Sequence, residues 1–182
     1  EGFWQVHLDA PQVLVERVVR GALGEDLEGA ADSRVLELYS GAGLFTLPLA
    51  ALVGSGGEVV SLEGNEQAVR DARRTLHDHP AARLASGRVS ARSVRELAGS
   101  LTGGRPDVVV LDPPRQGAGR EVIEAVGALG AERIVLVACD PAALARDLGT
   151  LLRAGYALGS MSALDMFPHT HHFETIAVLE RS

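Results

Sequence analysis

Short apolar segments of strand length alternate with amphipathic segments of helical periodicity along most of this 182-residue chain. A connection of helix length allows successive strands to run parallel, so the alternation predicts an α/β fold: a mostly parallel sheet with helices on both faces. The expected strands are Arg34–Leu38, Glu58–Glu63, Arg88–Arg92, Asp107–Asp112 and Arg133–Cys139. The expected helices are Pro11–Leu23, Leu44–Val53, Glu66–His77, Val94–Leu101, Arg120–Leu129 and Ala142–Ala154.

The C-terminal segment departs from this alternation. Tyr156–Asp165 and His172–Arg181 have strand patterns, and only Met166–His171 separates them. So short a connection permits a hairpin but no parallel crossover, which predicts that the last strand is antiparallel to the others. Residues 1–182 are therefore expected to form one domain around a seven-stranded sheet. Because the chain begins at Glu1 without a methionine, we expect it to be a fragment whose N-terminal part is missing.

Composition excludes several classes of protein. A single cysteine rules out a disulfide framework, and no secretory signal or membrane-spanning run is visible, so a cytoplasmic enzyme or binding domain is expected. The formal net charge is −7, which predicts that the chain by itself grips long RNA or DNA poorly. Two groups of arginines are interpreted as solvated surface rather than nucleic-acid contacts. They are Arg70, Arg73 and Arg74, and Arg88, Arg92 and Arg95.

Two glycines, Gly41 and Gly43, follow the first expected strand and precede a helix. Such a turn brings backbone N–H groups close to a ligand. A dinucleotide fingerprint would place a third glycine at Thr46, and Glu37 is expected to disfavour a diphosphate. Glu63 ends the next strand, where an acidic side chain can accept both hydroxyls of a ribose. This pattern favours adenosine without a diphosphate, as in S-adenosylmethionine, although a tight turn beside a surface glutamate remains the alternative.

Two further strand ends carry chemically informative residues. Asp112 precedes two prolines that stiffen the strand exit, and its carboxylate is expected to contact polar substrate atoms. The only cysteine, Cys139, ends a buried strand at the edge where parallel sheets bind ligands. A lone cysteine more often packs as a small apolar residue, and this alternative remains open from the residue itself.

Taken together, these motifs resemble the RNA (uracil-5)-methyltransferases, which use S-adenosylmethionine to make 5-methyluridine in tRNA or rRNA. The motifs extend over essentially the whole chain. They are Phe3-Trp-Gln5, Glu37-Leu-Tyr39-Ser-Gly41-Ala-Gly43, Glu63, Asp112-Pro-Pro-Arg115, Cys139-Asp-Pro141 with Arg146-Asp147, and Asp165-Met-Phe167-Pro-His169 through Glu174. The resemblance implies a Rossmann-like class I methyltransferase fold. It also implies that Cys139 is the nucleophile, that Glu174 is the proton acceptor, and that Gln5, Tyr39, Glu63 and Asp112 belong to the cofactor and target-base site.

The implied chemistry explains these residue types. Uracil C5 is a poor nucleophile until a thiolate, assigned to Cys139, adds to C6. Glu174 would then remove the C5 hydrogen after methyl transfer, and Asp112 could accept the uracil N3–H. Either Arg115 or the amides at the start of the following helix could favour the thiolate. The target uridine must lie in a loop or be flipped out of a helix.

Some positions depart from the family pattern. Leu44 and His7 stand where asparagines are usual, and Asp140 replaces the usual asparagine after the nucleophile. A metal site formed by the histidines at positions 169, 171 and 172 is rejected, because no further ligand type accompanies them. Family members usually carry an N-terminal RNA-binding β-barrel, so the resemblance implies a fragment that lacks this RNA-binding region. One cysteine also cannot hold the iron–sulfur cluster of some members. RNA is the expected partner, with no membrane and no obligate protein partner. An amino-group methyltransferase acting on adenine or guanine, or a protein that only binds S-adenosylmethionine, remains possible.

Overall fold

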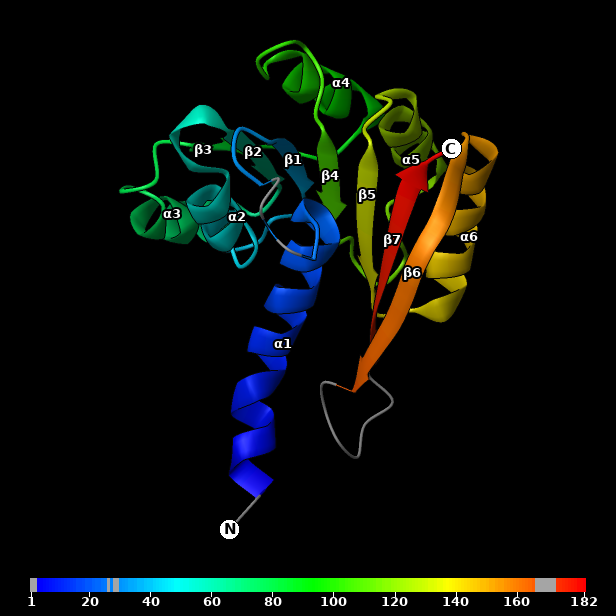
Figure 1. Cartoon of the computed structure of the whole chain (residues 1–182), viewed down its shortest axis with the longest axis horizontal. Helices are drawn as coiled ribbons and strands as arrows, with labels where there is room; N and C mark the ends of the chain where they lie inside the picture. Colours follow the sequence, from blue (N-terminus) through cyan, green and yellow to red (C-terminus); the bar gives the residue numbers. More distant parts are fainter. Residues whose placement is uncertain (1–2, 26, 28–29, 166–172) are drawn as a thin grey trace.

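A seven-stranded sheet in the order β3-β2-β1-β4-β5-β7-β6 forms the centre of the molecule (Figure 1). The computed structural model describes residues 3–25, 27, 30–165 and 173–182, with side chains from residue 11 onward. The strands are β1 (Arg34–Leu38), β2 (Glu58–Glu63), β3 (Ala82–Ser86), β4 (Val108–Leu111), β5 (Arg133–Ala138), β6 (Tyr156–Asp165) and β7 (Phe173–Arg181). The α-helices are α1 (Phe3–Leu23), α2 (Thr46–Val53), α3 (Glu66–Thr75), α4 (Ala91–Gly99), α5 (Arg120–Ala128) and α6 (Pro141–Arg153).

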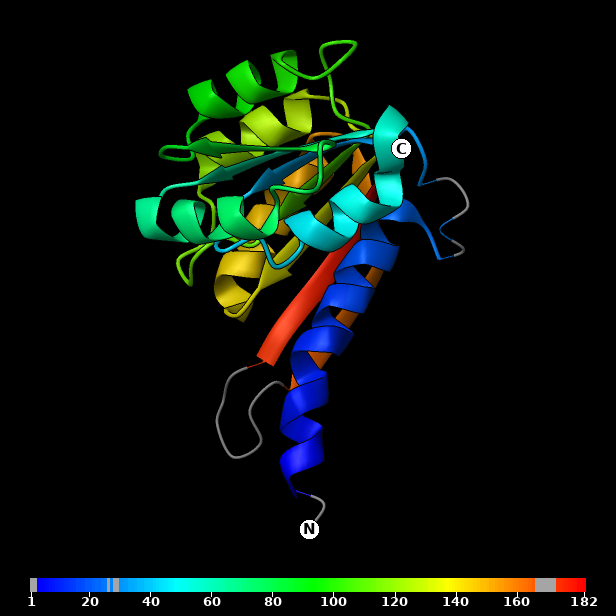
Figure 2. The same ribbon diagram turned by 90° about the vertical axis from the view of Figure 1, so that its left-hand side faces the viewer.

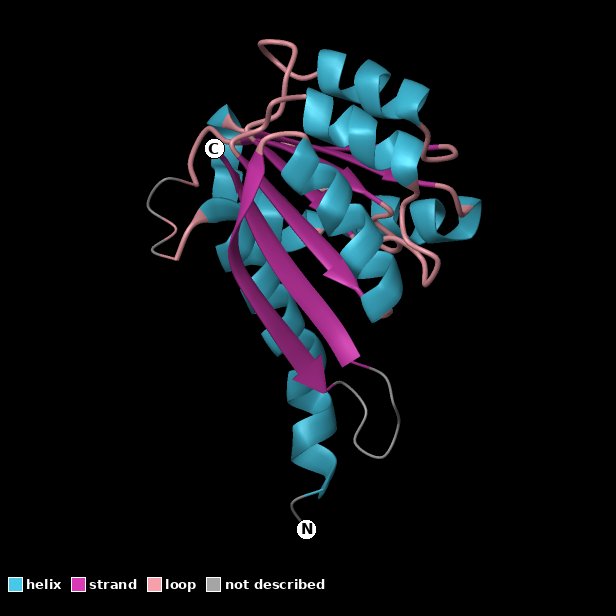
Figure 3. Cartoon of the chain, turned by 90° about the vertical axis from the view of Figure 1, so that its right-hand side faces the viewer, coloured by secondary structure: helices cyan, strands magenta, loops and turns pink. Residues whose placement is uncertain are grey.

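The strand directions confirm the expected fold class. Strands β3, β2, β1, β4 and β5 pair in parallel, whereas β7 is antiparallel to both β5 and β6. Figure 3 shows β6 and β7 as a long hairpin that extends past the other strands. None of the helices in the described part of the chain is long and apolar enough to cross a membrane.

Each face of the sheet is covered by helices (Figure 2). Leucines of β1 and β4 pack with α4, α5 and α6 on one face. Valines of the same strands pack with α1 and α2 on the other. Successive strand side chains point to opposite faces, so the continuous apolar runs of β4 and β5 reflect burial on both sides.

Two sequence predictions were wrong in their element limits. Residues 88–92 do not form a strand: Ser90 caps α4 in a capping box with Ser93, and the third strand lies earlier, at Ala82–Ser86. β3 is an edge strand with only intermediate or exposed side chains, so it lacks the apolar signal of the central strands. Helix α1 begins at Phe3 and contains Pro11, although proline favours the first turn of a helix, where we had placed it. The other limits differ by up to three residues.

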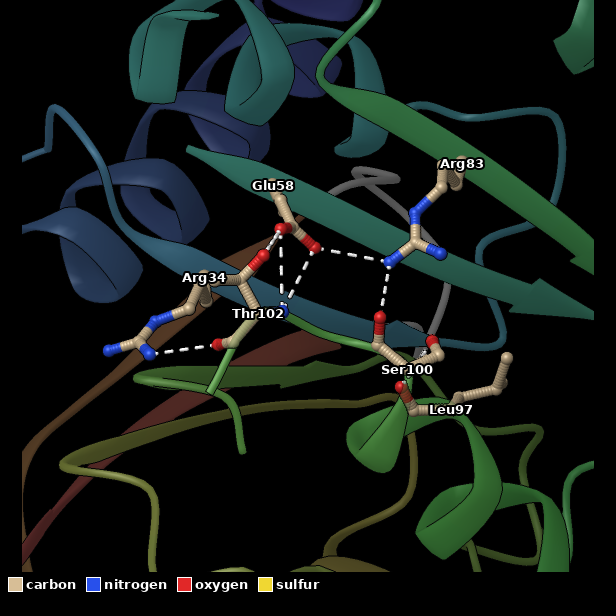
Figure 4. Close-up of polar contacts among 6 residues, drawn as sticks. All are labelled: Arg34, Glu58, Arg83, Leu97, Ser100 and Thr102. Carbon is tan, nitrogen blue, oxygen red and sulfur yellow. Dashed lines mark hydrogen bonds and ion pairs between the residues drawn. The ribbon is translucent and has the colours of Figure 1, made fainter. Parts of the chain in front are cut away.

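A polar cluster joins the starts of β1 and β2 to the segment between α4 and β4 (Figure 4). The Arg34 guanidinium donates to both carboxylate oxygens of Asp107, at 2.9 and 2.8 Å, and to the Thr102 carbonyl oxygen. Glu58 accepts hydrogen bonds from Thr102 and from Arg83. These contacts fix the N-terminal ends of neighbouring strands relative to one another, and therefore also the alignment of their opposite ends.

Candidate active site

The strand register aligns three of the predicted site residues at the C-terminal edge of the parallel strands. Leu38 pairs with both Leu62 and Leu111, so the next residues, Tyr39, Glu63 and Asp112, form a row across β1, β2 and β4. Ligands of open α/β sheets bind outside this edge.

The glycine turn after β1 is held by Glu63. The Gly41 amide donates to Glu63 Oε2 at 2.8 Å, and the Asn65 amide donates to Glu63 Oε1 at 2.7 Å. Gly41 and Gly43 have φ angles of 56° and 89°, a region that glycine occupies without strain. A Cβ atom on Gly41 would meet no atom within 4 Å, so this side of the turn faces open space. Each Glu63 oxygen keeps a second lone pair for a ligand hydroxyl.

Tyr39 also has a positive φ, 63°, and its ring packs against the core on the α4–α6 side of the sheet. Burial, followed by the negative charge of Asp147, raises the pKa of Tyr39 to about 12. Its phenol therefore stays protonated at neutral pH.

A cleft of about 540 Å³ lies between the C-terminal ends of β1 and β2, the segment before α4 and the loop that follows β4. Tyr39 and Glu63 line it on one side, and the loop supplies half of the lining residues. The lining residues are Tyr39, Glu63, Gly64, Arg88, Val89, Pro114, Gln116, Gly117, Ala118 and Gly119. Its size suits a small molecule.

Cys139 and Glu174 come together through the antiparallel pairing of β5 with β7. Ala138 pairs with Thr175, and continuing this register by one residue sets Cys139 opposite Glu174. Opposite residues of an antiparallel pair have Cα atoms about 4.5–5.5 Å apart. Cys139 is partly exposed just beyond the end of β5, and it is a free thiol. It is therefore accessible, unlike the buried packing residue of the alternative interpretation.

Asp112 lies close enough to Glu174 for their charges to interact. Burial, followed by the charge of Glu174, raises the pKa of Asp112 to about 6. Three of the residues assigned to catalysis, Cys139, Glu174 and Asp112, thus share one end of the sheet with the glycine turn.

Asp140, which departs from the family pattern, has a clear local role. Its side chain caps α6 by accepting a hydrogen bond from the Ala143 amide at 2.8 Å. The cap satisfies one of the helix amides that we had considered as support for a thiolate at Cys139.

Glu37 was interpreted wrongly from the sequence. It does not face an incoming ligand from the turn; it is 1% exposed, and its Oε2 accepts hydrogen bonds from Thr46 and Ser61. Burial is the main cause that raises the pKa of Glu37 to about 7, with a smaller contribution from Asp112. Within the described residues, Glu37 Oε1 and Ser40 Oγ are buried without a hydrogen-bond partner.

Some predicted residues cannot be placed. Gln5 lies in α1, but its side chain is outside the described part of the chain, as are residues 166–172 with the three histidines. Leu44 is half exposed beside the glycine turn. Sequence reasoning also missed Asp147, a buried carboxylate of α6, whose signal was its place in the Arg146-Asp147 motif.

The fold and the site together define the class of protein. The chain has the sheet order, the antiparallel β7 and the glycine turn with its acidic partner that are found in Rossmann-like class I methyltransferases. The sequence model of the tRNA (uracil-5-)-methyltransferase family matches residues 22–182. The chain belongs to this family.

Known relatives agree with this assignment. The chain is 45% identical to an uncharacterized RNA methyltransferase of Bifidobacterium longum, over 99% of this chain and 41% of the relative. It is 39% identical to the 23S rRNA (uracil(1939)-C(5))-methyltransferase RlmD of Methylococcus capsulatus, over 98% of this chain and 38% of that protein. Among solved structures, the tRNA (uracil-54, C5)-methyltransferase of Pyrococcus abyssi in complex with S-adenosyl-L-homocysteine has a TM-score of 0.73. It is 30% identical, over 93% of this chain and 38% of that one. The chain thus spans about two fifths of the length of these proteins.

Proposed function

We propose that residues 1–182 are the catalytic domain of a methyltransferase that transfers a methyl group from S-adenosylmethionine to C5 of a uridine in tRNA or rRNA, through a covalent adduct with Cys139. One observation carries the proposal: Cys139 and Glu174 are the residues next to the Ala138–Thr175 pair of β5 and β7, at the edge of the sheet that also holds the glycine turn. The activities for which two of the relatives are named, on uracil C5 of tRNA and of 23S rRNA, support the same target atom.

The cleft residues fit the cofactor. Glu63 is oriented by two amides and can accept ribose hydroxyls, Tyr39 offers an aromatic face, and Gly41 leaves space beside the backbone. Gln5 is assigned to the same site by the family resemblance. When bound, S-adenosylmethionine supplies an electrophilic methyl group.

Cys139 and Glu174 divide the remaining chemistry. The Cys139 thiolate forms a bond to C6 of the uracil, and the electron pair of the C5–C6 double bond becomes available at C5 for the incoming methyl group. The methylated carbon still carries its hydrogen. Glu174 takes this proton, the C5–C6 double bond forms again, and the Cys139 sulfur leaves as thiolate.

Asp112 orients the target base. Since its pKa is about 6, the side chain is mostly a carboxylate at neutral pH and can accept the uracil N3–H. Cytosine has no hydrogen at N3, so the same carboxylate would select against it. Positive charge needed to hold RNA is scarce in this chain, whose net charge is −7. We infer that the parts of a longer, cytoplasmic protein outside this chain supply most of the RNA contacts.

The decisive experiment uses the full-length protein and RNA that contains 5-fluorouridine. Fluorine at C5 cannot leave as a proton, so the covalent adduct should persist and be visible as a protein band of raised mass. Cys139→Ala should form none. An amino-group methyltransferase would form no adduct with either protein, and equal adduct in Cys139→Ala would overturn the mechanism.

Glu174 is tested on ordinary RNA. Glu174→Gln should accumulate a covalent intermediate, because methyl transfer proceeds while loss of the C5 proton is blocked. Glu180→Gln, at the exposed far end of the same strand, is the matched control and should turn over normally. Wild-type turnover by Glu174→Gln would remove Glu174 from its role.

A further inference from the structure

Two neighbouring side chains of α6 bind the backbone of the loop that follows β4. The Ala118 amide donates a hydrogen bond to Asp147 Oδ2 at 3.0 Å. Arg146 Nη2 donates to the Gln116 carbonyl oxygen at 3.4 Å, which is a weaker contact. Both bonds reach across about thirty positions of sequence, from the helix that starts beside Cys139 to the wall of the cofactor cleft.

The loop is shaped to accept the Asp147 carboxylate. Gly117 has a φ of 85°, and a Cβ atom there would lie 2.8 Å from Asp147 Oδ2 and 3.3 Å from the Ala143 Cβ. Any other residue here would be strained by the positive φ and would push against the Asp147 carboxylate. Gln116, Gly117 and Ala118 all line the cleft. Asp147 therefore contacts the wall of the cleft from the side of α6.

Burial of this carboxylate has no evident benefit for stability alone. Asp147 is 6% exposed, and burial raises its pKa against the opposing effects of the Ala118 amide and Arg146. Removing a carboxylate from water is costly, and an apolar side chain of similar size would often stabilise such a position better. In this position the carboxylate accepts a hydrogen bond from one amide of the cleft wall.

We propose that Asp147 is a positioning residue for the cofactor: through the Ala118 amide it holds residues 116–118 in the shape that binds S-adenosylmethionine, before the ligand arrives. The proposal rests on the proposed function only in that the cleft binds this cofactor. It requires neither the Cys139 adduct nor any particular RNA.

The test compares Asp147→Ala with Asp147→Asn in the full-length protein. Asparagine keeps an oxygen that can accept the Ala118 hydrogen bond and removes only the charge, whereas alanine removes the acceptor. We expect Asp147→Ala to raise the Kd for both S-adenosylmethionine and S-adenosylhomocysteine about tenfold, the size of one lost hydrogen bond to a charged acceptor. Asp147→Asn should stay within about threefold of wild type, because its neutral bond is the weaker one.

Hydrogen exchange of the ligand-free protein gives a second readout. Peptides that cover residues 116–119 should exchange faster in Asp147→Ala than in wild type, and the rate should be largely restored in Asp147→Asn. Thr150→Val controls for general destabilisation of α6, because Thr150 is buried on the same helix and bonds only within it. This control should leave both the Kd and the exchange of residues 116–119 unchanged.

Three results of the binding and exchange measurements would overturn the proposal. They are wild-type affinity and slow exchange in Asp147→Ala, equal weakening by alanine and asparagine, or equal weakening by Thr150→Val. Saturating cofactor should restore the turnover of Asp147→Ala, and a persistent loss of kcat would also contradict a positioning role. If the wild-type protein binds the cofactor but forms no adduct with RNA, the proposed function fails while this inference stands.

Discussion

The buried carboxyl of Glu37 makes the stability of this domain depend on pH in a way that a single substitution isolates. Burial raises its pKa from 4.5 to about 7, so the folded protein holds the proton more tightly than the unfolded chain does. A raised carboxyl pKa contributes stability that is fully present below the unfolded value and is lost as the pH rises through the folded value. The window of loss is therefore about pH 4.5 to 7.

The magnitude follows from the shift. A difference of about 2.5 pKa units corresponds to about 3.4 kcal/mol when ionisation is complete. With the same two pKa values, about 2.0 kcal/mol of this stability has already been lost at pH 6, and about 1.4 kcal/mol more is lost between pH 6 and pH 8.5. Glu37→Gln is nearly isosteric, keeps an oxygen to accept from Ser61 and Thr46, and does not ionise.

Urea unfolding at pH 6 and pH 8.5 measures the effect. Between these two pH values, we expect the free energy of unfolding of the wild type to fall by about 1.4 kcal/mol more than that of Glu37→Gln, with unchanged m-values. The exposed Glu66→Gln, on α3, serves as the control and should follow the wild type. If Glu37→Gln and the wild type lose the same stability over this interval, Glu37 is not a buried acid with a raised pKa, and the reasoning is refuted.

Two further predictions concern the site itself. Gly41→Ala and Gly54→Ala both place a Cβ at a positive φ in open space, so each should lose about 1 to 3 kcal/mol of stability. Only Gly41→Ala should weaken binding of S-adenosylmethionine in calorimetry, and equal affinities would remove the turn from the cofactor site. Adduct formation with 5-fluorouridine RNA should fall as the pH drops through about 6, where Asp112 gains its proton. The midpoint of this fall should move to lower pH in Glu174→Gln, because the charge of Glu174 helps to raise the pKa of Asp112. An unchanged midpoint would show that the two carboxyl groups do not interact.

The sequence predicts the fold where apolar patterns are strong and fails where neighbouring elements decide. The buried runs of β1, β2, β4 and β5 are continuous, and their limits were placed within one residue. β3 has no buried side chain, so its neighbour at 88–92, with alternating apolar residues, was mistaken for it. Site prediction shows the same division. Gly41, Glu63, Asp112 and Cys139 were proposed from their places at strand ends, whereas Glu37 and Asp147 lie buried within packed elements, where no strand-end signal marks them.

The direction of β7 explains how the two residues assigned to covalent chemistry meet. Cys139 follows the end of β5, whereas Glu174 is the second residue of β7. In a parallel strand, a residue at the start would lie at the opposite edge of the sheet, near Arg34 and the polar cluster, far from any C-terminal strand end. Because β7 is antiparallel, its first residues lie at the ligand edge, and the register with β5 sets Glu174 opposite Cys139. The proposed general base is therefore available only in a sheet whose last strand reverses, which links the hairpin of the C-terminal segment to the chemistry.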